Sequence, residues 1–162
     1  MKKRKSWQEK LNDSKDLPKI AQYERKPKKW PEGTCIIPAP LEVDTIMKKV
    51  PKGKLITINE IREVLAKKHD TDFACPITTG IFSWIAANAA AEQAVEGKKK
   101  ITPYWRTLKT GGLLNKKYPG GIKGLTKLLR AEGHKVIRKG KSKNFCVADY
   151  EKALTDYEKI KI

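Results

Sequence analysis

The chain has 162 residues, 39% of them hydrophobic, which suits one domain with its own core and excludes two of ordinary size. Lysine and arginine number 36 against 18 aspartate and glutamate, and the resulting net charge of +18 predicts a polyanionic partner. We expect no membrane anchor, because no run approaches the roughly 18 consecutive apolar residues of a spanning helix. The basic start is followed by Trp7-Gln8-Glu9-Lys10 instead of the apolar run of a signal peptide, so we expect a cytoplasmic protein.

Residues 1–40 are rich in lysine and proline and are predicted to form a basic, partly irregular extension. Ser6 and Glu9 have the spacing of a capping box, which predicts one short helix over residues 6–13. Residues 26–31, Lys-Pro-Lys-Lys-Trp-Pro, predict extended or loop chain. We therefore expect residues 41–162 to form the domain and the part from Val50 onward to fold as a unit.

Helical spacing of apolar side chains marks residues 41–50, where Pro51-Lys52-Gly53 ends the predicted helix. A short strand is predicted next, over residues 55–57. Residues 59–68 and 78–96 are predicted helices joined by a polar segment, an arrangement typical of a helix-turn-helix. The second of these helices is apolar nearly all round, which predicts that it is deeply packed.

Beyond a lysine turn, residues 101–108 are predicted to form a strand, and residues 109–121 a loop dense in glycine and lysine. An amphipathic helix begins at Ile122, and Gly133 is expected to end it as a C′ glycine. The segments on either side of a basic turn at residues 139–144 predict a hairpin.

Asp149 is expected to cap a final helix whose inner face carries Tyr150, Ala153, Leu154 and Tyr157. Taken together, the elements predict an α+β fold with a mainly helical, winged-helix-like core, a small sheet and the lysine-rich N-terminal extension.

The order of motifs over residues 50–135 resembles the DNA-binding domain of the alkylguanine-DNA alkyltransferases. Single motifs of this kind are weak, but their sequence and spacing together are specific. The matching segments are Val50-Pro51-Lys52-Gly53-Lys54-Leu55-Ile56-Thr57, Glu60-Ile61, Asn88, Pro103-Tyr104-Trp105-Arg106, Tyr118-Pro119-Gly120-Gly121 and Leu128-Leu129-Arg130-Ala131-Glu132-Gly133-His134. Residues 1–49 do not resemble the companion domain of the repair enzymes.

Two positions of the family's Pro-Cys-His-Arg motif carry other chemistry here. The resemblance places Tyr104 at the acceptor cysteine and Trp105 at the histidine beside it. A phenol, with an ordinary pKa of ~10, is a poor nucleophile toward an alkyl carbon, and indole cannot act as a base. The resemblance places Asn88 at the family's helix-end asparagine and Glu132 in its proton network, but with Trp105 at the histidine position the sequence favours a structural role for both. The resemblance therefore implies a non-enzymatic protein that needs no cofactor and binds duplex DNA, including alkylated or distorted sites, with a repair protein as a further candidate partner.

The family also flips a damaged base out of the duplex with an arginine and a tyrosine. The resemblance puts Thr79 near the arginine's place, and Ile58 or Asn59 at the tyrosine's. Tyr104 and Trp105 either plug the family's base pocket or stack on a base inside it, and the sequence leaves both interpretations open.

We expect nucleic acid to contact the helix-turn-helix, the active-site motif and the glycine-rich loop. Lysines there would contact phosphates, and glycines would allow close approach of the backbone. Tyr118 would either stack on a base or pack as an ordinary loop tyrosine at the domain edge. The arginine of the motif would anchor either a phosphate or a loop. The candidate contacts are Arg106, Lys109, Lys116, Lys117, Tyr118, Gly120, Gly121, Lys123 and Thr79.

Two alternative functions stay open. The charge equally permits an RNA- or ribosome-associated binding module. The chain could also be an active alkyl acceptor that uses Cys75 or Cys146. The three cysteines, which include Cys35, lack the spacing of a zinc site and are expected to be reduced and buried; His69 and His134 are not expected to bind metal.

Overall fold

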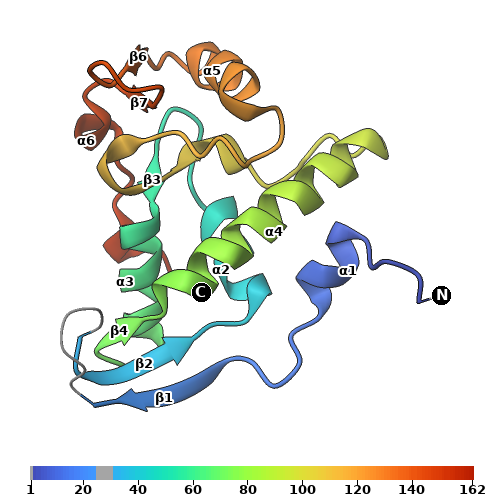
Figure 1. Ribbon diagram of the computed structural model, residues 1–162, viewed down its shortest axis with the longest axis vertical. Coiled ribbons are helices and arrows are strands. Elements are labelled where there is room, and N and C mark those ends of the chain that lie inside the picture. Colours follow the sequence, from blue (N-terminus) through green and yellow to red (C-terminus); the bar gives the residue numbers. More distant parts are fainter. Residues whose placement is uncertain (1, 25–30) are drawn as a thin grey trace.

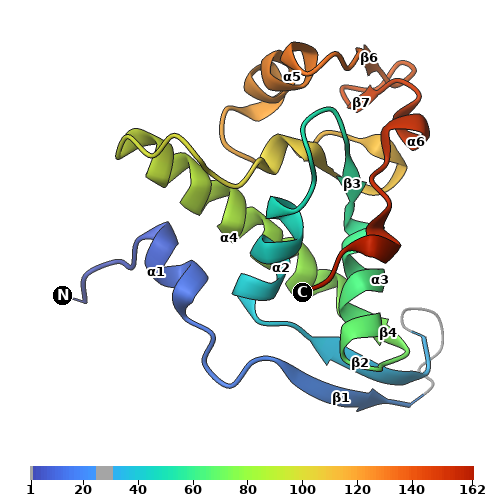
Figure 2. The same ribbon diagram turned by 180° about the vertical axis from the view of Figure 1, so that it is seen from behind.

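The structure is a computed structural model that describes residues 2–24 and 31–162 (Figure 1). The fold is α+β, and the long helix α4 (Pro76–Val95) crosses its middle. A three-stranded sheet lies at one end of the molecule, and helix α5 (Gly121–Ala131) lies with a small hairpin at the other (Figures 1 and 2). Among the described residues no helix is both long and apolar enough to cross a membrane.

The N-terminal segment has more regular structure than the sequence predicts. Helix α1 (Trp7–Asn12) begins at the expected capping box, in which the Ser6 hydroxyl and the Glu9 carboxylate each accept a bond from the other residue's backbone N–H. Strands β1 (Lys19–Tyr23) and β2 (Gly33–Ile37) then pair antiparallel. Of the loop predicted over residues 26–31, residues 26–30 lie outside the described part of the chain.

The same segment supplies side chains to the core. Leu11 and Ile36 are buried in one cluster with Val43 and Ile46 of α2 (Pro40–Lys48). Strand β2 also pairs in parallel with β4 (Phe73–Ala74), which directly precedes α4. These contacts join the N-terminal segment to the same core as residues 41–162.

The predicted helices of the central region are confirmed. Helix α3 (Ile58–Lys68) starts at a capping box in which the Thr57 N–H donates to the Glu60 carboxylate at 3.0 Å. The strand expected before it shortens to β3 (Ile56–Thr57), which pairs in parallel with β5 (Thr107–Leu108).

The strand predicted over residues 101–108 is wrong for most of its length. Residues Tyr104–Arg106 form a 3-10 helix, and only β5 is extended. Pro103 has no N–H to give to a sheet, and the Tyr104 N–H bonds back to the Thr102 carbonyl at 2.8 Å, which turns the chain out of strand geometry.

Helix α5 and its Gly133 end, where φ is +90°, are confirmed, as is the hairpin of β6 (Val136–Arg138) and β7 (Phe145–Val147). The final helix is much shorter than predicted: α6 spans only Tyr150–Ala153, and the Asp149 side chain does not cap it.

The shortening has a tertiary cause. The Leu55 N–H donates to the Ala153 carbonyl at 2.9 Å, and the Thr155 N–H donates to the Leu55 carbonyl at 2.8 Å. This bridge draws the chain away from the helical path. Tyr157, which was expected on the helix's inner face, starts a separate 3-10 turn, Tyr157–Lys159.

Candidate nucleic-acid interface

Tyr104 and Trp105, which the resemblance places at the family's cysteine and histidine, belong to a packed aromatic cluster. The Tyr104 ring meets Trp105 edge-on, with ring centroids 5.4 Å apart, and meets Tyr118 edge-on at 6.3 Å. The Tyr118 hydroxyl donates to the Ser83 hydroxyl at 3.0 Å. Because the Tyr104 ring packs against both of the others, this geometry favours the plugged pocket over a base-stacking site.

Burial also makes both phenols unsuitable as nucleophiles. It raises the pKa of Tyr104, and it raises the pKa of Tyr118 to about 12. Tyr118 is only 3% exposed, which contradicts the expectation that its ring stacks on a base from the glycine-rich loop.

Tyr118→Phe is expected to lower the free energy of unfolding by about 1 kcal/mol, because it leaves the buried Ser83 hydroxyl without that partner. Affinity for DNA should stay the same, since the ring faces the interior. Thermal unfolding and a binding titration of the same sample check both parts. A variant that folds as stably as the wild type but binds DNA several-fold more weakly would return Tyr118 to the interface.

Glu132 joins residues 105 and 106 to the loop before β3. Its carboxylate accepts hydrogen bonds from the Gly53 N–H at 2.8 Å, from the Trp105 indole N–H, and from Arg106 Nε at 2.8 Å. The Arg106 and Glu132 side chains are only 14% and 6% exposed. Burial by itself would raise the pKa of Glu132, but these hydrogen bonds and the guanidinium charge together hold it below its usual value.

Arg106 also donates from Nη1 to the Val50 carbonyl at 2.8 Å. Of the two roles the sequence allowed, phosphate contact and loop anchoring, the described structure provides the second. With Nε and Nη1 engaged inside the protein and the side chain only 14% exposed, Arg106 is poorly positioned to bind a phosphate.

Two expected contacts on α4 belong to the helix itself. The Thr79 side chain is fully buried and donates to the Cys75 carbonyl at 2.7 Å, which contradicts its assignment to the nucleic-acid surface. The Asn88 amide donates to the Trp84 carbonyl at 2.9 Å, so it supports the helix.

Two of the three cysteines, Cys35 and Cys75, are poorly placed to accept an alkyl group because they are buried. Cys75 is buried at the start of α4, where its sulfur accepts the Thr78 N–H at 3.5 Å. Burial, with a smaller contribution from Cys75, raises the pKa of Cys35 to about 11. Cys146 is partly exposed, so the expectation that all three thiols are buried is wrong for this one.

Three of the predicted lysines gather at one surface pocket of about 450 Å³, between α4 and residues 109–117. One wall consists of apolar residues and a glycine of α4, and the other of cationic and amide side chains. We call this the α4 pocket; its lining residues are Ile77, Gly80, Ile81, Trp84, Lys109, Asn115, Lys116 and Lys117.

The apolar wall was not predicted. Ile77 is 60% and Ile81 46% exposed, although the composition of α4 suggested deep packing all round. The sequence does contain a pattern that predicts this apolar face, because Ile77, Ile81 and Trp84 stand at i, i+4 and i+7 on one side of the helix. The helix carries no lysine or arginine, so the positive charge of the pocket comes from the facing loop.

Trp84 is held from two sides. Its indole N–H donates to the Lys117 carbonyl at 3.2 Å, which ties the loop to the helix. Trp7 of α1 packs edge-on against the same ring at 4.7 Å. The Glu92 carboxylate fixes α1 on α4 by accepting the backbone N–H groups of Trp7 and Gln8.

The remaining predicted contacts lie elsewhere. Lys123 is exposed on α5, where it borders a shallow depression with Gly120, and Gly121 begins that helix. The structure therefore separates Lys123 from the lysines of the α4 pocket.

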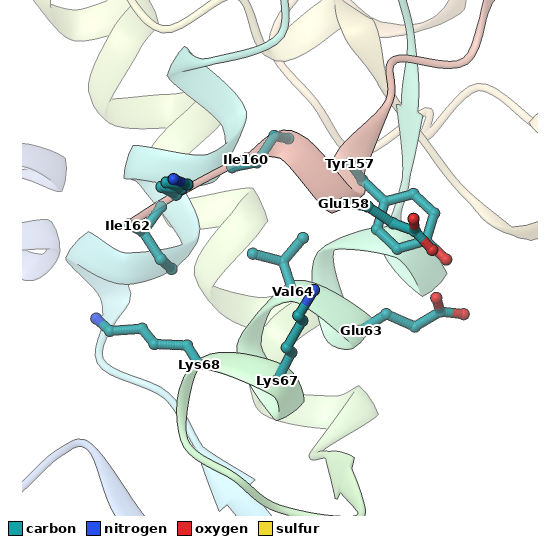
Figure 3. A pocket seen from close by; sticks show the side chains of 9 residues that line it. Glu63, Val64, Lys67, Lys68, Tyr157, Glu158, Ile160 and Ile162 are labelled. Carbon is teal, nitrogen blue, oxygen red and sulfur yellow. The ribbon is translucent and has the colours of Figure 1, made fainter.

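Another pocket, of about 590 Å³, lies between α3 and the C-terminal segment. Its walls mix charges, with the Glu63 and Glu158 carboxylates near Tyr157 and with Lys67 and Lys68 on α3 (Figure 3). A hydrogen bond to Glu63 is the main cause that raises the pKa of Tyr157 to about 12. This mixture is a poor match for a polyanion.

No metal site can be assembled from the described residues, in which no three His, Cys, Asp or Glu side chains are suitably grouped. His69 is instead paired with Glu42, with 2.6 Å between His69 Nε2 and the carboxylate.

No protein-family model and no curated protein matches this chain. Among solved structures, it is similar to the crystal structure of S. pombe Atl1 in complex with damaged DNA containing O6-carboxymethylguanine. The two share 17% sequence identity over 72% of this chain and 93% of that one, with a TM-score of 0.46. At this distance the likeness assigns no function to the chain.

Proposed function

We propose that the protein binds duplex DNA without catalysing a reaction, and that the α4 pocket receives a base displaced from the duplex at a damaged or distorted site. The observation that carries this proposal is the pairing of one apolar and one cationic wall in a single exposed pocket. A nucleotide has the same two-sided chemistry, with a flat base next to an anionic phosphate.

The cationic wall suits phosphates because carboxylates of the described protein do not neutralise its charges. Lys109, Lys116 and Lys117 are exposed, and among the described residues none of them forms an ion pair with a carboxylate. Contacts of this kind supply affinity and orient the protein but do not read sequence.

The apolar wall suits a displaced base. Ring stacking in single-stranded complexes contributes ~1–3 kcal/mol per base, and Trp84 with the two isoleucines offers a comparable surface. Displacing a base costs a few kcal/mol, least for one that is mismatched or damaged. A pocket of this type would therefore favour weakened base pairs whatever the chemical structure of the lesion. The order of motifs over residues 50–135 supports the same function.

The absence of catalysis is inferred from the acceptor position. Burial raises the pKa of Tyr104, which keeps its phenol protonated. The Trp105 indole N–H is hydrogen-bonded to Glu132, and Cys75 is buried. A stoichiometric alkyl group found on Cys75 or Cys146 by intact-mass and peptide analysis, after incubation with O6-alkylguanine DNA, would overturn this part.

Replacing Lys116 and Lys117 by alanine is expected to flatten the plot of log K against log salt by up to about two units, because each phosphate contact contributes ~0.9. Fluorescence anisotropy with a short duplex over a salt series measures this slope. Lys98→Ala with Lys99→Ala is the matched control, since both lysines are exposed in a turn after α4 and do not line the pocket.

An unchanged slope in the Lys116/Lys117 variant would remove the α4 pocket from the interface. Stronger binding to structured RNA than to duplex DNA at every salt concentration would favour the RNA-associated alternative.

A further inference from the structure

We infer a second nucleic-acid-binding surface on the outer face of α5 and the adjoining hairpin, one that holds a different segment of phosphate backbone from the one at the α4 pocket. We call this surface the α5 cap. Its residues are Lys123, Lys127 and Arg130 of α5 with Arg138, Lys139, Lys141 and Lys143 of the hairpin. The inference goes beyond the proposed function, which concerns the α4 pocket alone.

Helix α5 divides into two faces. Leu125 and Leu129 are buried against the core, whereas Lys123, Lys127 and Arg130 are exposed at i, i+4 and i+7 on the opposite side. At a rise of about 1.5 Å per residue, this cationic row extends over roughly 10 Å. The row borders a shallow depression of about 650 Å³, completed by Gly120, Gly124 and Thr126.

The charges of the row are not neutralised within the described part of the protein. Helix α5 contains no acidic residue, and none of its three cations forms an ion pair there. The nearest carboxylate in the sequence, Glu132, is already bound to Arg106. The hairpin, which lies next to α5 at one end of the molecule in both views (Figures 1 and 2), carries four further exposed cations.

The lining favours a nucleic acid over an acidic protein. Energetically important residues of protein interfaces are typically aromatic or large, set in packed pockets. The depression beside α5 instead has two glycines and a threonine among its cations, which lets a backbone approach closely. Such a surface recognises phosphate charge and has little means of reading a base.

The depression on α5 shares no lining residue with the α4 pocket. One copy of the protein therefore presents two distinct cationic hollows, whose linings come as near in the sequence as Lys117 and Gly120. This arrangement predicts that it can hold two duplexes at once.

The test uses two short mismatched duplexes, one labelled with a donor fluorophore and one with an acceptor. The full-length protein is added at one molecule for every two duplexes. Sedimentation velocity first establishes that the protein is monomeric under these conditions, so that energy transfer reports two duplexes on one copy. We expect energy transfer with the wild type and its loss in the triple variant Lys123→Ala, Lys127→Ala, Arg130→Ala. The triple variant Lys98→Ala, Lys99→Ala, Lys100→Ala is the control, because it loses the same three charges from an exposed turn, and it should keep the transfer.

A second pair of variants leaves every lysine in place. A Cβ at Gly124 would meet only the Pro119 carbonyl oxygen, at 4.0 Å, so Gly124→Ala is sterically tolerated and should retain bridging. Gly124→Glu places a carboxylate in the depression and should abolish it.

Unchanged energy transfer in the triple variant and in Gly124→Glu would overturn the inference. So would a flattening by two or more units of the salt slope for a single duplex in the triple variant, because the α5 cap and the α4 pocket would then contact the same duplex. Absence of energy transfer with the wild type would also overturn the inference if the Lys116/Lys117 variant has a flattened salt slope, because the α4 pocket would then hold DNA while the α5 cap does not. An unchanged slope in that variant instead marks failure of the proposed function, since bridging needs both surfaces.

Discussion

A chain that begins at Ala39 is expected to lose its cooperative unfolding transition. The deletion removes Leu11 and Ile36 from the core and strips β4 of its partner strand, just before α4. Burying one large aliphatic side chain contributes about 1.5–3 kcal/mol, and small domains are stable by only about 5–15 kcal/mol. Circular dichroism against temperature measures the effect.

Removing only residues 1–4 is the matched control, because the described residues of that stretch are exposed and precede the Ser6 cap. This shorter deletion should unfold like the full chain. If the chain beginning at Ala39 had the same transition midpoint as the full chain, residues 1–38 would be a dispensable extension, as the sequence alone suggested.

Glu132→Gln is expected to lower the free energy of unfolding at neutral pH by about 3–5 kcal/mol, the usual consequence of leaving one member of a buried ion pair uncompensated. Arg106 would keep its charge at 14% exposure, facing a neutral amide. Chemical denaturation of both proteins measures the difference. Glu158→Gln, an exposed carboxylate, is the control and should change stability by less than about 0.5 kcal/mol.

The same comparison has a signature in pH. The folded pKa of Glu132 lies below its ordinary value, so its contribution is complete above the unfolded pKa of roughly 4.3 and is lost as pH falls through the folded value. The stability difference between wild type and Glu132→Gln should therefore shrink below about pH 4. A difference that stayed constant down to pH 2 would mean that the charge of Glu132 contributes nothing to the fold.

Features set by neighbours in the sequence could be predicted. Ser6 with Glu9 marked the start of α1, the apolar stripe of residues 59–68 marked α3, and Gly133 marked the end of α5. In each case the capping group or the core-facing residues lie within a few positions of one another, so local patterns carry the information.

Features set by tertiary pairing could not. Strands β3, β4 and β5 have two residues each, too few for an alternating pattern to show. The end of α6 depends on a bridge between Leu55 and Leu154, about a hundred positions apart in the chain.

In the candidate site, too, features set by local sequence could be predicted and features set by tertiary contacts could not. Lys109, Lys116 and Lys117 were predictable as a cationic loop, because charge in a glycine-rich segment is exposed in most folds. The inward direction of Tyr118 depends on Ser83 of another element, and the outward direction of Ile77 and Ile81 depends on which faces of α4 are covered. Neither the direction of Tyr118 nor that of the two isoleucines can be predicted from neighbouring residues in the sequence.

The central claim, that the α4 pocket receives a displaced base, is tested most directly by comparing affinity for a fully paired duplex with affinity for the same duplex carrying one mismatch. We expect the wild type to prefer the mismatched duplex by about tenfold, the equivalent of ~1.4 kcal/mol. Replacing Ile77 and Ile81 by serine should remove that preference and leave the salt slope unchanged, because apolar contacts release no counterions. Equal affinity of the wild type for both duplexes, or a preference that survives the double replacement, would contradict the account.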